Sequence, residues 1–69
     1  MSVARITEIT SDSARSFEDA IENGIQRATK TLKNVTGAWV QDQEVVVKDN
    51  NITAFRVRMK VTFVLNDKD

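Results

Sequence analysis

The chain has 69 residues with ten basic and ten acidic side chains, and this zero net charge argues against a nucleic-acid partner, which needs an excess of Lys and Arg. It contains no Cys and no His, which excludes disulfides, the usual zinc ligand sets and nucleophilic catalysis by a Ser-His or Cys-His pair. Because so small a domain buries too little surface for a secure core, we expect a single domain over residues 1–69 that self-association completes.

The first predicted element is a short strand over residues 3–10, in which β-branched Val, Ile and Thr are prominent. Ser11, Asp12 and Ser13 come next, and residues of these types favour turns and helix caps. We therefore expect the strand to end before Ser11.

An amphipathic helix is the clearest element of the sequence. Its apolar residues recur at i, i+3, i+4 and i+7 spacing and form one stripe: Phe17, Ala20, Ile21, Gly24, Ile25, Ala28, Leu32 and Val35. Gly24 lies within this stripe, where its missing side chain allows a strand to approach closely. Acidic residues crowd the first turns, and Lys30 and Lys33 lie in the last turn, as suits the helix dipole.

The sequence also predicts where this helix begins and ends. Ser13 or Ser16 is the expected N-cap, and Ser16 with Asp19 approximates a capping box. Asn34 and Gly37 are expected to end the helix, because Gly and Asn are the residues that most often follow a helix.

Two further strands are predicted, over residues 39–48 and 53–65. The last strand alternates between an apolar face and a polar face that carries Arg56, Arg58, Lys60 and Thr62. Residues 49–51 separate the two strands, and Asn tolerates the positive φ that tight hairpin turns need. The predicted fold class is therefore α+β, with β-α-β-β order and a three-stranded antiparallel sheet packed on one helix.

The register of this hairpin has two candidate solutions. A two-residue loop at Asn50 and Asn51 gives the pairs Trp39–Thr62, Gln41–Lys60, Gln43–Arg58 and Val45–Arg56. It also turns Asp42 and Glu44 toward the apolar side, whereas a three-residue turn pairs Asp42 with Arg58 and Glu44 with Arg56. We favour the first register because it keeps Ala38, Val40 and Val46 with the other core residues, and Asp42 and Glu44 would then lie beyond the end of the helix, near a subunit contact.

The remaining chemistry of the sequence argues against an enzyme and against a membrane protein. Gly24 and Gly37 are the only glycines, so no glycine-rich phosphate loop exists, and the carboxylate pairs are expected to be solvated surface. No apolar run approaches the roughly 20 residues of a membrane span, and the N-terminus lacks the apolar region of a signal peptide. We expect a cytoplasmic protein without catalytic activity and without a membrane partner.

Trp39 is the only Trp of the chain and admits two interpretations. It is either an anchor in a core or subunit interface, or a flat apolar surface beside Gln41, Arg56 and Arg58. The second combination suits an aromatic ligand with polar edges or a phosphate. The row of cations in the last strand is equally consistent with a solvated face or with cross-strand ion pairs.

Three stretches together resemble the dodecin family. They are S-x-x-S-F-E-x-A-I at residues 13–21, R-A-x-K-T-L at 27–32 and F-x-V-x-M-K-V-x-F-x-L at 55–65. The resemblance spans nearly the entire chain and implies a subunit whose sheet wraps around its helix, assembled into a hollow homododecamer. Family members typically hold flavins in pairs at subunit contacts, for storage, buffering or photoprotection, and some also bind coenzyme A.

The chain departs from the family pattern at both flavin-contacting positions. The Trp on which family members stack the flavin aligns with Gly37, two residues before Trp39, and positions two apart share one face of a sheet. The Gln that contacts the flavin edge aligns with Arg56, which offers only hydrogen-bond donors. The resemblance implies flavin mononucleotide (FMN) or a related flavin as first ligand, with these residues at its site: Gly37, Trp39, Gln41 and Arg56.

Two other functions remain open at this point. One is a flavin-free dodecin-like shell, either associated with calcium or holding another cargo, with Asp42 and Glu44 as second-tier candidates for ligand or cation contact. The other is a small structural or adaptor subunit that binds a different protein through its exposed sheet face.

Overall fold

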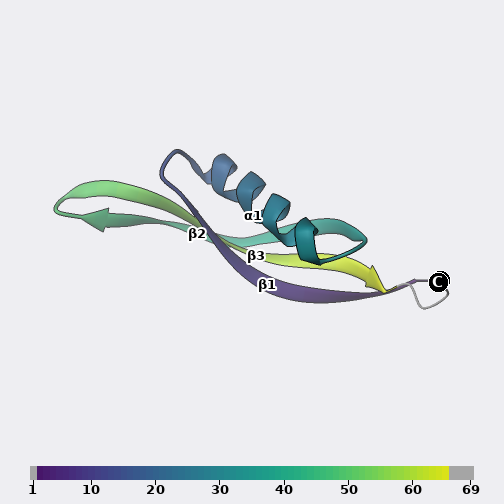
Figure 1. Cartoon of the computed structure of the whole chain (residues 1–69). Coiled ribbons are helices and arrows are strands. Elements are labelled where there is room, and N and C mark those ends of the chain that lie inside the picture. The colour runs from purple at the N-terminus through teal and green to yellow at the C-terminus, as the bar shows by residue number, and fades with distance from the viewer. Residues whose placement is uncertain (1, 66–69) are drawn as a thin grey trace.

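The computed structural model describes residues 2–65 and consists of one sheet with one helix on it (Figure 1). The elements are β1 (Val3–Ser13), α1 (Phe17–Thr31), β2 (Val35–Lys48) and β3 (Asn51–Leu65). β3 is the central strand and pairs antiparallel with both neighbours, in the order β1-β3-β2. This architecture confirms the predicted α+β fold with β-α-β-β order.

The core lies between α1 and the face of the sheet that it covers. Ala20, Val57 and Met59 are fully buried there, and Ile9, Phe17, Ile21 and Ile25 pack against them. A Cβ atom built at Gly24 would lie 2.7 Å from Met59 Cε and 3.0 Å from Ser11 Cβ. The close approach of strand and helix that Gly24 predicted is therefore present.

β1 is longer than predicted, because Ser11, Asp12 and Ser13 continue the strand instead of ending it. Ser11 and Ser13 pair with Val57 and Phe55 of β3. Ser13 is buried, but its hydroxyl donates to Asp19 Oδ2 (2.6 Å) and accepts from the backbone N–H of Arg15 (2.9 Å). These bonds satisfy the polar side chain, so the ladder with β3 prevails over the turn preference of the sequence.

The helix begins where the sequence predicts and ends earlier. Ser16 is the N-cap, and its Oγ accepts from the backbone N–H of Asp19 (2.9 Å). The last residue is Thr31, and Asn34 follows with a φ of 64°, as expected of a residue beyond a helix. The prediction that Gly37 ends the helix is wrong, because Gly37 lies within β2, which begins at Val35.

The favoured hairpin register is wrong. The turn is formed by Asp49 and Asn50, whose φ angles are 52° and 66°, and Lys48 faces Asn51. Irregularities between Val46 and Val47 and between Val40 and Asp42 then shift the ladder. The resulting pairs are those of the rejected alternative, with Asp42 opposite Arg58 and Glu44 opposite Arg56.

Electrostatics explains this register. In the favoured prediction, two carboxylates point toward the apolar side, where a charge without a partner is costly. The β-bulges place the carboxylates on the same face as the guanidinium groups. They also keep Val40 opposite Met59 and Ala38 opposite Val61, on the side of the core.

The molecule is elongated, with principal extents of 53 × 19 × 13 Å. The β2–β3 hairpin projects past the first turn of α1, and the start of β1 lies beside the end of β3 at the other end (Figure 1). Within residues 2–65, no helix has the length and apolar character that crossing a membrane requires.

Candidate functional site

The open face is the side of the sheet that α1 does not cover (Figure 1). By the register, every second residue of β3 lies on the open face together with its cross-strand partners. The open face divides into two parts along the strands. The ionic end consists of Asp12, Arg56, Glu44, Arg58 and Asp42, and the aromatic end consists of Glu8, Lys60, Trp39, Ile6, Thr62 and Gly37.

At the ionic end both arginines are engaged by carboxylates. Arg56 donates from Nε to Asp12 Oδ1 (2.9 Å) and from Nη2 to Asp12 Oδ2 (3.1 Å). Arg58 lies 2.9 Å from Asp42 Oδ1 through Nη1 and 2.6 Å from Glu44 Oε1 through Nη2. Of the two interpretations of the cationic row, cross-strand ion pairs therefore describe this part of it.

These contacts change the ionisation of the groups that make them. The hydrogen bonds from Arg56 hold the pKa of Asp12 below its ordinary value, although burial opposes the shift. The hydrogen bonds to Asp42 and Glu44 raise the pKa of Arg58 above its ordinary value. Both arginines of the ionic end are therefore engaged by carboxylates, and with three carboxylates to two guanidinium groups its formal net charge is −1.

The aromatic end exposes its largest side chains. Trp39 is 62% exposed and Ile6 is also 62% exposed, on the outer strands β2 and β1. Thr62 of β3 pairs with Ile6 on one side and with Gly37 on the other, and a Cβ atom built at Gly37 would meet no atom within 4 Å. Trp39 and Gly37 thus share one face, as the two-residue spacing predicts, and open space adjoins the indole.

Lys60 is the cross-strand partner of Trp39, and its Nζ lies 5.3 Å from the centroid of the Trp39 ring. At this distance over an aromatic face, an ammonium group is attracted by the quadrupole of the ring. The predicted partner of Trp39 was Thr62, so this contact was missed. The difference of two residues along β3 comes from the turn, which lies one residue earlier than predicted. The irregularities between Val46 and Val47 and between Val40 and Asp42 shift the ladder by one residue each in opposite directions and cancel.

The predicted site residues fall into separate places. Arg56 precedes Lys60 by four residues, which is about 13 Å along a strand at about 3.3 Å per residue. Gln41 is the extra residue of the bulge between Val40 and Asp42. The structure therefore brings Trp39 and Gly37 together and leaves Arg56 at the ionic end.

Sequence reasoning missed Ile6 and Asp12 as members of the open face, and it placed Lys60 on that face but opposite Gln41 instead of Trp39. Asp12 was missed because the first strand was ended too early, and Ile6 because no pairing of that strand was assigned. One signal was available for Lys60. In the favoured register Asp42 and Glu44 face the apolar side of the sheet. Two carboxylates on that side indicate a bulge between Trp39 and Asp42, which moves them to the polar face.

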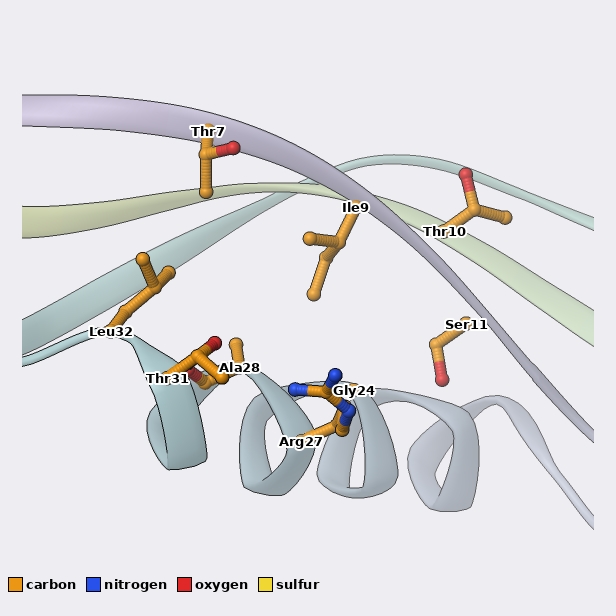
Figure 2. A pocket seen from close by; sticks show the side chains of 9 residues that line it. All are labelled: Thr7, Ile9, Thr10, Ser11, Gly24, Arg27, Ala28, Thr31 and Leu32. Atoms are coloured by element: carbon orange, nitrogen blue, oxygen red, sulfur yellow. The ribbon is translucent and has the colours of Figure 1, made fainter.

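A groove of about 440 Å³ lies on the other side of the sheet, between the outer edge of β1 and α1 (Figure 2). Thr7 and Ile9 of β1 face Ala28 and Leu32 across it, and Arg27 is its one charged lining residue. The groove lies on the covered face of the sheet, so it cannot share a ligand with Trp39.

The carboxylates of the described residues do not form a metal centre. No group of three or more acidic side chains gathers there in a geometry suited to a metal ion. Asp42 and Glu44 both bind Arg58, so a cation at this place would compete with a guanidinium group.

Comparison with known proteins identifies relatives over nearly the full length of the chain. Residues 3–66 match the family described as Dodecin. The calcium dodecin of Mycobacterium tuberculosis is 29% identical over 63 residues, which cover 91% of this chain and 89% of that protein.

Solved structures agree with this match. Dodecin from Streptomyces davaonensis is 35% identical, with a TM-score of 0.89 over 94% of this chain and 96% of that chain. Dodecin from Streptomyces coelicolor is 25% identical, with a TM-score of 0.89 over 94% and 93% of the two chains. The family match and the shared fold show that this chain belongs to the dodecin family.

Proposed function

We propose that residues 1–69 form one domain, the subunit of a homododecameric shell that binds and stores a small aromatic molecule without catalysis. FMN or a related flavin is the first candidate, and the cytoplasm is the proposed compartment. The observation that carries the proposal is the indole of Trp39, which is 62% exposed on the open face. So large an apolar group is normally covered by a ligand or by another subunit.

The surroundings of Trp39 fit a planar ring. Gly37 leaves open space beside the indole, and Ile6 offers an apolar surface on the far strand. A ring lying over Gly37 and Thr62 has apolar neighbours on two sides and the Thr62 hydroxyl beneath it. Any flat ring can stack in this way, so the adenine of coenzyme A is a second ligand that the same surface suits.

The four predicted ligand residues differ in how readily they can contact a ligand. Trp39 and Gly37 are available without rearrangement. Arg56 can bind a ligand only by releasing Asp12, because two of its donors already bind that carboxylate. We therefore assign the ring contact to Trp39 and Gly37, and we give Arg56 and Gln41 a secondary part at the neighbouring edge.

Assembly is supported by surfaces that a single chain leaves uncovered. Within residues 2–65, eight large apolar side chains are exposed, among them Val3, Val47 and Ile52. Among the strands that the structure describes, the outer edges of β1 and β2 have no partner in the same chain, and the groove between β1 and α1 is open. Uncovered edges and apolar patches of this kind favour packing between copies.

Titration of FMN into the purified protein tests the ligand. Because Trp39 is the only Trp, its fluorescence reports on the open face alone. We expect strong quenching on binding. Trp39→Ala, which has no Trp and is followed by the fluorescence of the flavin itself, should bind about tenfold or more weakly while the size of the assembly is retained. Unchanged Trp39 emission at saturating FMN would remove the flavin from this site.

The relative named calcium dodecin favours a second candidate, a flavin-free shell associated with calcium. Isothermal titration with CaCl₂ distinguishes it, since heat of binding without any FMN response supports the second candidate alone. An adaptor that binds another protein through the open face is the third possibility. It is supported if the chain remains a monomer that binds neither ligand.

A further inference from the structure

The three cations of the open face are not equivalent. Arg56 is held by Asp12, and Arg58 is held by Asp42 and Glu44. Among the described residues, no carboxylate lies within 4.0 Å of the Lys60 ammonium, although Glu8 is its cross-strand partner on β1. The contact that Lys60 makes is the one with the Trp39 ring, at 5.3 Å.

This difference decides which cation an incoming anion can engage. To bind an anion, Arg56 or Arg58 must give up hydrogen bonds to a carboxylate. Lys60 gives up only a cation–π contact at a partly exposed site, which is weak. Its charge is carried on a flexible four-carbon stem, so the ammonium can move from the indole to a neighbouring anion.

We propose that Lys60 is the specificity-determining residue of the Trp39 surface and selects phosphate-bearing aromatic ligands over uncharged ones. This inference rests on the proposed function, because it assumes that Trp39 receives an aromatic ring. It assigns different roles to two adjacent side chains. Trp39 contributes affinity for the ring, and Lys60 contributes preference for the negative charge attached to it.

The two roles are separable because the two interactions have different physical origins. Stacking depends on the flat π surface and tolerates many ring systems. Attraction of Lys60 depends on ligand charge, and a phosphate monoester carries about −1.5 to −2 at pH 7. Salt screens this attraction and leaves stacking nearly unchanged.

FMN and riboflavin are the matched probes, since they share one ring system and differ by the phosphate. We expect the intact protein to bind FMN about fivefold to tenfold more tightly than riboflavin at low salt, the ratio expected of one partly exposed charged contact. Lys60→Gln should bring this ratio close to one with little change in riboflavin affinity, and Lys60→Arg should preserve it. Raising the salt concentration should reduce the ratio in the wild type and in Lys60→Arg, but not in Lys60→Gln.

Lys48→Gln is the control, because it removes one positive charge from the hairpin end of the same sheet. It should keep the wild-type preference for FMN. Equal binding of the two flavins by the wild type, or an undiminished preference in Lys60→Gln, overturns the role of Lys60 while flavin binding stands. If neither flavin binds the wild type, the proposed flavin function itself fails, and this inference fails with it.

Discussion

At the scale of single residues, the open face separates two kinds of chemistry along one strand. Arg56 and Arg58 are both held by carboxylate partners, whereas Lys60 and Thr62 border the exposed indole of Trp39. Charged networks of this kind bind solvent and hold strands in register. The exposed indole surface of Trp39 has no partner of comparable strength, so it is the part of the open face that is available to a ligand.

Gly37→Trp tests whether the space beside Trp39 is part of the ligand site. The substitution is sterically possible because no atom lies within 4 Å of a Cβ at this position, and Gly37 has no positive φ. A second aromatic ring there should tighten FMN binding by roughly tenfold, since stacking is worth about 1–3 kcal/mol per ring. Unaltered affinity in an intact assembly would exclude Gly37 from the pocket.

The Asp12–Arg56 pair makes a prediction about pH. Folding lowers the pKa of Asp12, so the pair stabilises the folded chain above the unfolded-state value of about 3.9. This contribution is lost as the pH falls through the lower folded-state value. In an NMR titration of the side-chain carboxyl, Arg56→Gln should raise the Asp12 pKa toward the ordinary value. An equal pKa in both proteins would refute the assignment.

At the scale of elements, the contact between α1 and the sheet depends on a missing side chain at Gly24. Gly24→Ala would place a Cβ 2.7 Å from Met59 Cε and 3.0 Å from Ser11 Cβ, so that both the buried Met59 side chain and β1 must shift. Overpacking typically costs about 1–3 kcal/mol, and the better helix propensity of Ala returns up to about 1 kcal/mol. We expect a net destabilisation of about 1–2 kcal/mol, measured by urea unfolding at constant protein concentration.

Two companion variants make this test specific. Gln26→Ala changes an exposed position of the same helix and should shift stability by less than about 0.5 kcal/mol. Met59→Leu removes the Cε atom, so combining it with Gly24→Ala should recover part of the loss. A neutral or stabilising Gly24→Ala would mean that the strand and helix separate at little cost.

At the scale of the whole molecule, a thin chain of 53 × 19 × 13 Å buries few side chains completely. Most of β2 is exposed in the single chain, including Trp39, Val40 and Val45. A subunit with so little interior of its own needs neighbours to cover this surface.

Light scattering tests the proposed assembly directly. We expect a mass near twelve times that of the 7.8 kDa chain, with no free subunit at micromolar concentration. Cooperative dissociation and unfolding should follow on dilution or heating, because the subunit is stabilised by its partners. A monodisperse monomer at micromolar concentration would contradict the homododecamer.

The sequence by itself determined the fold class and the role of Gly24, and it narrowed the N-cap to Ser13 or Ser16, of which the structure uses Ser16. Each of these depends on local rules, namely the helical spacing of apolar residues, the capping side chain and the need for a small residue in the stripe. The tight turn before β3 was likewise visible in its Asn residues, although its position was one residue off.

Only the tertiary structure decided the arrangement of the open face. The length of β1 followed from pairing with β3 and from the bonds of Ser13 to α1, which override the turn preference of Ser and Asp. The bulge before Asp42 followed from the gain of placing carboxylates beside arginines. Because side chains alternate along a strand, that one extra residue returns Trp39 to the open face. Without it Trp39 would face Val61, and with it Trp39 faces Lys60.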